Sequence, residues 1–145
     1  MKSFRDLYIW QASVDLAVDV ITLTNDFPAR QQRVLVEQMQ RAAVSVPSNI
    51  AEGKGRLSQR ELRQFLGIAR GSLFELGTQI EIATRIGVLE AGTRANLDNS
   101  IGKLGAGIKR HVASSLLNSQ IAQQLNSKGR TSASPSGLDQ AAIRT

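Results

Sequence analysis

The chain of 145 residues is 41% hydrophobic and 4% aromatic, and its formal net charge at pH 7 is +6. This length predicts one domain with a modest core, and the absence of cysteine excludes disulfides, a thiol nucleophile and thiolate metal sites. The positive charge favours a polyanionic partner, RNA or DNA, whereas so few aromatic residues argue against a stacking platform for single-stranded bases. No apolar run approaches membrane-spanning length and no signal-peptide pattern is evident, so we expect a cytoplasmic protein.

The first amphipathic segment covers about residues 6–25. Leu7, Trp10 and Val14 follow one another at steps of three and four, which is the spacing of one face of an α-helix. Further apolar residues lie off this stripe, as expected for a helix buried on two sides, with a second subunit as one neighbour. Pro28 follows the segment and ends it, because the residue before a proline disfavours the helical conformation.

The second segment covers about residues 29–52 and contains Pro47. We expect this helix to kink at Pro47, because a proline removes the hydrogen bond to the carbonyl group four residues earlier, that of Ala43. Gly53 is expected to end the helix in the left-handed conformation, which glycine adopts without steric cost. Three polar side chains are predicted to serve the freed carbonyl group: Ser45, Ser48 and Asn49.

The third segment covers about residues 59–86 and has the strongest helical periodicity in the chain. Ser58 and Glu61 form a predicted capping box, in which each side chain accepts a hydrogen bond from the backbone N–H of the other residue. Gly87 is expected to end the helix. Glycines inside a helix each cost about 1 kcal/mol relative to alanine. We interpret three of them as points of close approach between helices: Gly67, Gly71 and Gly77.

The fourth segment begins near residue 91 or 93, extends to about residue 124, and is diluted by glycine. Residues 126–145 are rich in small and polar residues, which predicts a flexible tail. Residues 1–125 are therefore predicted to form an all-α domain, an antiparallel four-helix bundle in up-down-up-down order. The length expected for its second and third helices favours oligomer contacts along the flank.

No arrangement of residues favours catalysis, a metal ion or a cofactor. His111 is the only histidine, which excludes the paired Glu-x-x-His pattern of di-metal bundles, and we interpret it as a structural or surface residue. Glu52, Glu75 and Glu81 could meet as a carboxylate site between the second and third helices. The favoured interpretation is a buried polar network that fixes helix register. Its predicted members are Ser45, Asn49, Glu52, Glu75 and Gln79.

Cationic residues gather around the predicted turn between the second and third helices. Arg56, Arg60 and Arg63 follow at steps of four and three, so they share one side of the third helix. With neighbouring residues they are predicted to form a basic strip that contacts phosphates without reading sequence. The predicted strip consists of Arg41, Lys54, Arg56, Arg60, Arg63 and Arg70. The alternative is a solvated surface whose charge the acidic first helix neutralises.

A long motif spans residues 41–53, Arg-Ala-Ala-Val-Ser-Val-Pro-Ser-Asn-Ile-Ala-Glu-Gly. Shorter motifs accompany it: Phe-Arg-Asp-Leu at 4–7, Trp-Gln at 10–11, and Gly-Ser-Leu-Phe-Glu-Leu-Gly-Thr-Gln at 71–79. In these motifs the chain resembles the 23S rRNA intervening-sequence proteins, small bacterial four-helix bundle proteins, over residues 4–117. The chain departs from that pattern at residues 31 and 33–34, where Gln and Arg-Val replace the family's Glu and Tyr-Gly and make this edge more basic.

The resemblance implies a ring-like homopentamer. It also implies kinship with the accessory variability protein of diversity-generating retroelements, a basic pentamer that binds nucleic acid and a reverse transcriptase. From the residues and the resemblance together we expect a non-enzymatic oligomer that binds RNA or DNA through its basic surface. The alternative is a protein adaptor whose basic surface engages an acidic partner such as a reverse transcriptase.

Overall fold

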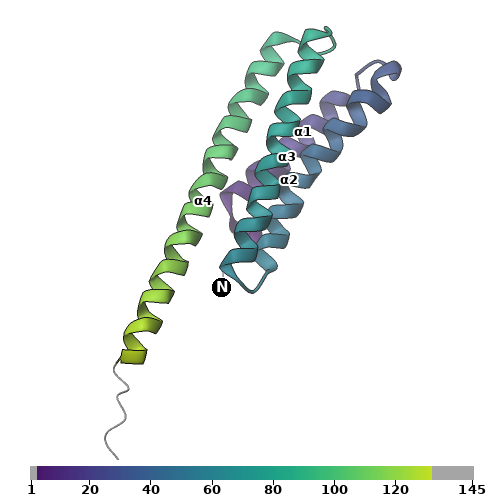
Figure 1. Ribbon diagram of the computed structural model, residues 1–145. Coiled ribbons are helices and arrows are strands. Elements are labelled where there is room, and N and C mark those ends of the chain that lie inside the picture. The colour runs from purple at the N-terminus through teal and green to yellow at the C-terminus, as the bar shows by residue number, and fades with distance from the viewer. Residues whose placement is uncertain (1–2, 132–145) are drawn as a thin grey trace, which may run out of the picture.

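The protein is a bundle of four long helices, and the computed structural model describes its residues 3–131 (Figure 1). The elements are the single-turn η1 (Phe4–Asp6), α1 (Tyr8–Thr24), α2 (Glu37–Gly55), α3 (Gln59–Arg85) and α4 (Ala91–Thr131). Successive helices run in opposite directions and pack against one another in sequence order, and α4 also contacts α1. The predicted all-α, up-down-up-down architecture is confirmed.

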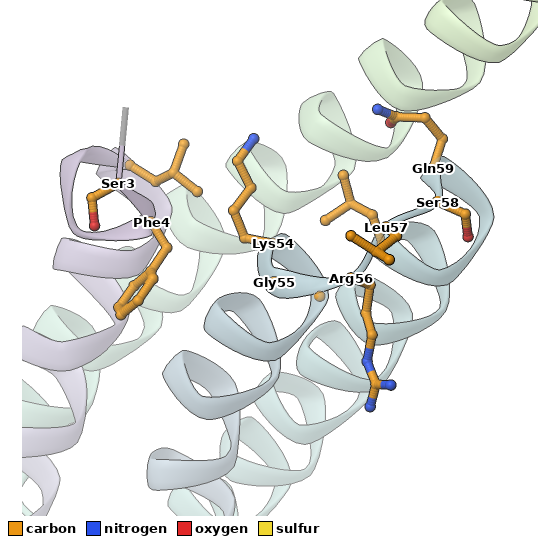
Figure 2. Close-up of a pocket in the computed structure, with 11 residues that line it drawn as sticks. Ser3, Phe4, Lys54, Gly55, Arg56, Leu57, Ser58 and Gln59 are labelled. Atoms are coloured by element: carbon orange, nitrogen blue, oxygen red, sulfur yellow. The ribbon is translucent and has the colours of Figure 1, made fainter. Parts of the chain in front are cut away.

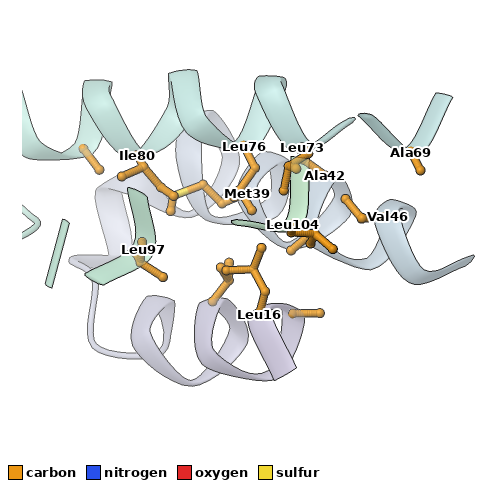
Figure 3. Packing of buried hydrophobic residues seen from close by; sticks show 14 of the residues in the cluster. Leu16, Met39, Ala42, Val46, Ala69, Leu73, Leu76, Ile80, Leu97 and Leu104 are labelled. Atoms are coloured by element: carbon orange, nitrogen blue, oxygen red, sulfur yellow. The ribbon is translucent and has the colours of Figure 1, made fainter. Parts of the chain in front are cut away.

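The core lies where the inward faces of all four helices meet (Figure 3). Leu16 of α1, Met39 of α2, Leu76 of α3 and Leu104 of α4 are each at most 2% exposed. Met39, Leu76 and Leu104 belong to apolar stripes of the sequence, because positions three and four apart face the same side of an α-helix. In α1 the predicted stripe does not form the core face, since Leu7, Trp10 and Val14 are only half-buried. The buried face of α1 includes Ile9, Leu16 and Val20 instead. Burial of one such side chain contributes about 1.5–3 kcal/mol. Other fully buried large residues are Ile9, Val20, Val36, Val46, Ile50, Leu66, Leu73, Ile80 and Ile108.

The second helix begins irregularly. Where the sequence predicts α-helix from residue 29, the chain forms the 3-10 turn η2 (Ala29–Gln31) and the π-helical turn η3 (Gln32–Val36) before α2 starts. A π-helical turn holds more residues than an α-helical one, so it changes which side chains face inward. Here it buries Leu35 and Val36 in the core.

Pro47 lies inside α2, which continues unbroken through it. The sequence predicts that the polar side chains around Pro47 accept the role of partner to the Ala43 carbonyl group. The structure corrects this prediction, because their hydrogen bonds go to other groups. Ser48 Oγ donates to Val44 O at 2.8 Å, and Asn49 Nδ2 donates to Ser45 O at 2.8 Å. Each side chain reaches back to the carbonyl group four residues earlier, which is the usual local option for a polar residue within a helix.

The turn between α2 and α3 differs from the prediction at Gly53. This glycine is buried inside α2, which extends to Gly55, and it does not adopt the left-handed conformation. Its role is close packing: a Cβ atom placed on it would lie 2.7 Å from Cβ of Phe65 in α3. The predicted capping box is present in part. Ser58 Oγ accepts from the Glu61 N–H at 3.1 Å, but the Glu61 carboxylate contacts the Ser58 hydroxyl and not its N–H.

The turn between α3 and α4 confirms the prediction at Gly87. This residue has φ of 82°, the left-handed conformation that favours glycine. The Val88 N–H donates to Ala83 O at 3.0 Å, and the Gly87 N–H donates to Thr84 O at 3.1 Å. These two bonds define a Schellman motif, which satisfies the last carbonyl groups of α3 and reverses the chain.

The glycines interpreted as close-approach points in α3 do not have that role. A Cβ atom on Gly67, Gly71 or Gly77 would meet nothing within 4 Å. The tight contact lies in α4 instead, where a Cβ atom on Gly107 would lie 2.9 Å from Cγ2 of Ile9 in α1. Gly107 therefore allows α1 and α4 to approach and close the bundle.

Helix α4 has 41 residues and would be about 60 Å long at 1.5 Å per residue. Ser115 is its last buried residue, and the following turns project beyond the other helices (Figure 1). The helix extends to Thr131, six residues into the segment predicted to be a flexible tail. Residues 132–145 of that predicted tail lie outside the described residues.

Candidate nucleic-acid interface

Arg63 was predicted to contact phosphates, but the structure turns it inward between α3 and α4. Its Nη1 donates to Ser119 Oγ at 2.9 Å and to both O and Oγ of Ser115 at 3.2 Å. Ser115 Oγ in turn donates to Gln59 Oε1 at 2.6 Å. These bonds join the start of α3 to the last buried turn of α4, so Arg63 is removed from the basic strip.

Two further arginines of the predicted strip lie on aromatic rings. The guanidinium carbon of Arg56 lies 4.7 Å from the centroid of the Phe65 ring, and the same group pairs with Glu52 at 2.7 Å. That of Arg70 lies 4.7 Å from the centroid of the Phe74 ring, and this arginine is half-buried. Both side chains are oriented by contacts within the protein, and the charge of Arg56 is already paired.

The remaining strip residues Arg41, Lys54 and Arg60 are exposed, and no ion pair involves them within the described residues. Arg41 lies on α2 beside Ile21 of α1, away from the α2–α3 turn. The positive charge of Lys54 acts on His111 of α4. Burial lowers the pKa of His111, and the charges of Lys54 and Arg110 lower it further. The predicted strip of six is therefore not one surface.

Sequence reasoning missed a second source of positive charge, the length of α4. Lys103, Arg110 and Lys128 are exposed and recur after about two and about five helical turns, so they share one side of α4. We call these three residues the α4 basic face. From residue 99 to residue 131 the chain contains no Asp or Glu. A count of charge along this helix, rather than around the turn, would have revealed it.

The acidic residues near α4 are concentrated at the opposite end of the bundle. Glu81 accepts from Arg85 at 2.7 Å and also pairs with Arg94, which lies 3.2 Å from Asp98. The hydrogen bond from Arg85 holds the pKa of Glu81 below its ordinary value, and the charge of Arg94 acts in the same direction. Charges are thus neutralised near the α3–α4 turn, whereas the α4 basic face remains without a counter-charge among the described residues.

The predicted polar network divides into separate pairs. Ser45 and Asn49 do meet, with Asn49 Nδ2 at 3.0 Å from Ser45 Oγ, and their further partner is Ser72 of α3, 2.9 Å from Ser45 Oγ. Gln79 donates to Glu75 at 3.3 Å on the same helix and does not reach Ser45 or Asn49, which corrects the prediction. Glu52 pairs with Arg56 at the surface. Sequence spacing identified the polar α2 positions but missed Ser72.

The carboxylate site considered for Glu52, Glu75 and Glu81 does not form, because each side chain pairs with a different neighbour. Within residues 3–131, no three His, Cys, Asp or Glu side chains gather in a way that could hold a metal ion. In the same part of the chain, no helix combines the length and hydropathy needed to cross a bilayer.

A pocket of about 610 Å³ lies at the end of the bundle, between η1 and the α2–α3 turn (Figure 2). Phe4, Leu7 and Leu62 contribute apolar walls, and Leu57 is fully exposed at the turn. Polar and cationic side chains complete the lining: Ser3, Lys54, Arg56, Ser58 and Gln59. Sequence reasoning described this turn as cationic but did not identify a pocket.

The model of the 23S rRNA-intervening sequence protein family matches residues 5–110, and the chain belongs to that family. A crystal structure from Bacteroides thetaiotaomicron VPI-5482, described as a protein with unknown function from the S23 ribosomal protein family, is 18% identical in sequence. It superposes with a TM-score of 0.66 over 72% of this chain and 97% of its own. At that identity the likeness shows the fold alone. Among curated proteins, none matches the chain.

Proposed function

We propose that this protein is a non-enzymatic, oligomeric nucleic-acid-binding protein that contacts the phosphate backbone through α4. The observation that carries this proposal is the α4 basic face, Lys103, Arg110 and Lys128, on a helix free of acidic residues from residue 99 to 131. Lys54 and Arg60 extend the positive surface at the adjoining end of the bundle. Exposed cations without counter-charges release bound ions from nucleic acid on contact, which drives binding without sequence readout.

Binding rather than catalysis is the function that these side chains support. The positive surface combines exposed lysine and arginine with few aromatic residues, which suits contact with phosphates better than recognition of base edges. Within residues 3–131, no carboxylate or hydroxyl group forms a hydrogen bond with the His111 side chain that would activate it as a base. The chain belongs to the 23S rRNA-intervening sequence protein family, and the RNA in that family's name is consistent with an RNA partner.

The test is fluorescence anisotropy with a structured RNA, a duplex DNA and a single-stranded DNA at about 50 and about 200 mM salt. We expect the affinity for the RNA to fall steeply as salt rises. The variant Lys103→Glu/Lys128→Glu should weaken binding by about tenfold or more and reduce the slope against salt by about two. Absence of salt-dependent binding to every probe would overturn the proposal.

The matched control is Arg30→Glu/Arg33→Glu, which makes the same charge change on η2 and η3. Both arginines are exposed and, like the two lysines, form no ion pair within the described residues. We expect this control to change the affinity much less than the α4 variant. An equal loss in both variants would show that net charge alone attracts the nucleic acid and that α4 has no special role.

Oligomerisation is supported by two apolar faces with opposite charges. On the projecting end of α4, Leu117, Ile121 and Leu125 recur every four residues and are 46–65% exposed, close to cationic Lys128 and Arg130. The outer side of α1 exposes apolar Tyr8 and Val18 beside acidic Asp15 and Asp19. Contact between α4 of one copy and α1 of the next would be head-to-tail, and repetition of such a contact can close a ring, such as a homopentamer.

Light scattering after size exclusion tests this arrangement. We expect the native protein to have about five times the 15.7 kDa mass of one chain, and Ile121→Asp/Leu125→Asp to reduce that mass toward one chain. A monomeric native protein would contradict the ring. The alternative, a protein-adaptor oligomer whose basic surface engages an acidic protein partner, would be contradicted by the same result.

A further inference from the structure

Lys54 places a positive charge at the pocket at the end of the bundle. Figure 2 shows its side chain between the turn that carries Phe4 and the turn that carries Leu57. Its charge also acts on His111, as does that of Arg110. No ion pair involves Lys54, Arg110 or His111 within residues 3–131, so an anion placed beside Lys54 would meet positive charge without a competing carboxylate partner.

The helices hold this arrangement in place. Nη2 of Arg110 lies 3.7 Å from the position of a Cβ atom on Gly107, at the point where α4 approaches Ile9 of α1. Arg63 ties the next turns of α4 to the start of α3 through Ser115 and Ser119. These contacts fix the start of α3 and this part of α4 relative to one another, and the close approach of Gly53 to Phe65 ties the end of α2 to α3.

The pocket itself has the size and lining of a small-ligand site. Its volume of about 610 Å³ falls within the range of about 300–1,000 Å³ that is usual for such sites. Phe4, which lines the pocket, is held in place, because Trp10 packs edge-on against its ring at 5.3 Å and the Arg5 guanidinium lies 4.8 Å from the ring centroid. Leu57 at the turn is 102% exposed, so an apolar side chain is available there without a packing role.

We infer that this end of the bundle binds one unpaired nucleotide of a nucleic acid, with its base in the pocket lined by Phe4, Leu57 and Leu62 and its phosphate beside Lys54 at the rim of the pocket. An unpaired base has two apolar faces and an attached anion, which match apolar walls beside a cationic rim. A base within a duplex is stacked and cannot enter. One pocket differs from the stacking platform that the low aromatic content argues against, because it holds a single base.

This inference rests on the proposed function and adds a preference for unpaired positions. The experiment compares an RNA hairpin that has one bulged nucleotide with the same hairpin without the bulge, and with one whose bulge lacks the base. We expect the native protein to bind the bulged hairpin about tenfold more tightly than either of the others. The same three hairpins made of DNA show whether the pocket prefers a nucleotide of RNA or of DNA.

Two pairs of variants locate the site. Leu57→Ser should reduce the preference for the bulge about fivefold, whereas Val34→Ser, at an exposed apolar residue on η3, should leave it unchanged. Lys54→Gln should weaken binding of the bulged hairpin more than that of the paired one, whereas Lys103→Gln should weaken both equally. Leu57 and Val34 are both exposed, so folding is expected to be preserved in these two variants.

Each outcome decides between the two proposals. Salt-dependent binding of all hairpins with equal affinity would overturn the nucleotide pocket and leave the α4 interface standing. A bulge preference that Leu57→Ser and Val34→Ser reduce equally would also overturn the pocket. Equal binding of the bulge with and without its base would show recognition of bent RNA rather than of a base. No binding of any hairpin would overturn both proposals.

Discussion

Gly53 of α2 lies so close to Phe65 of α3 that a Cβ atom placed on the glycine would be 2.7 Å from the Phe65 Cβ. The same Cβ atom would lie 3.3 Å from the carbonyl oxygen of Leu62. Both neighbours belong to parts of α3 that cannot rotate away, a Cβ atom and a backbone oxygen. The absence of a side chain at Gly53 therefore sets how closely α2 and α3 approach near their connecting turn.

The first prediction follows from that distance. Gly53→Ala should lower the free energy of unfolding by about 1–3 kcal/mol, because the two helices must separate to admit the methyl group. Urea unfolding followed by circular dichroism measures the change. The control is Gly55→Ala, where a Cβ atom would meet nothing within 4 Å and little change is expected. Equal effects at the two positions would show that the contact with Phe65 is not tight in solution.

The second prediction concerns exposed glycines in the middle of α3. Gly71→Ala should raise the free energy of unfolding by about 0.5–1 kcal/mol, because alanine restricts the unfolded chain and favours helix. A Cβ atom placed on Gly71 would have no other atom of the same chain within 4 Å. The same urea measurement applies, and Gly67→Ala should behave alike. Destabilisation accompanied by a lower oligomer mass would instead place this side of α3 in a subunit contact.

The sequence predicted the helices and their end at Gly87 because those depend on local patterns. Apolar residues three and four apart form one face of a helix, and a glycine after such a pattern is typical of a left-handed helix end. Gly53 shows the limit of this reasoning. A glycine that ends a helix and one that admits a neighbouring helix look the same in sequence, and only the position of Phe65 distinguishes them.

The candidate site was less predictable because it depends on residues far apart in the chain. Arg63 has the spacing of an exposed cation, yet its partners Ser115 and Ser119 lie more than 50 positions away. The pocket likewise needs η1 and the α2–α3 turn to meet. The direction in which such a side chain points cannot be predicted from spacing on one helix, because it depends on these distant contacts. The net positive charge of the chain, in contrast, follows directly from its composition.

The third prediction separates the structural role of Arg63 from a role in binding. Arg63→Ala should lower the free energy of unfolding by about 1–2 kcal/mol, because it removes three hydrogen bonds that tie α3 to α4. Arg60→Ala, at an exposed neighbour, should change it by less than about 0.5 kcal/mol. Urea unfolding checks both values. A neutral result for Arg63→Ala would mean that its bonds to Ser115 and Ser119 are replaced by water without cost.

The fourth prediction is a dependence of stability on pH that originates at His111. Burial and the charges of Lys54 and Arg110 lower its pKa in the folded protein below the ordinary value of 6.5. Between the folded pKa and 6.5 the unfolded chain binds more protons than the folded one, so the free energy of unfolding should fall as pH drops below about 6.5. Urea unfolding at a series of pH values from neutral to mildly acidic measures this fall.

The variant His111→Gln identifies the source of that dependence, because His111 is the only histidine in the chain. It should remove the part of the pH dependence that begins near 6.5 and leave the part at lower pH, where carboxylates titrate. Lys54→Gln removes one of the two charges that act on His111, so it should raise the folded pKa and shrink the effect. An unchanged pH profile in His111→Gln would assign the dependence to other groups and contradict the lowered pKa of the half-buried His111.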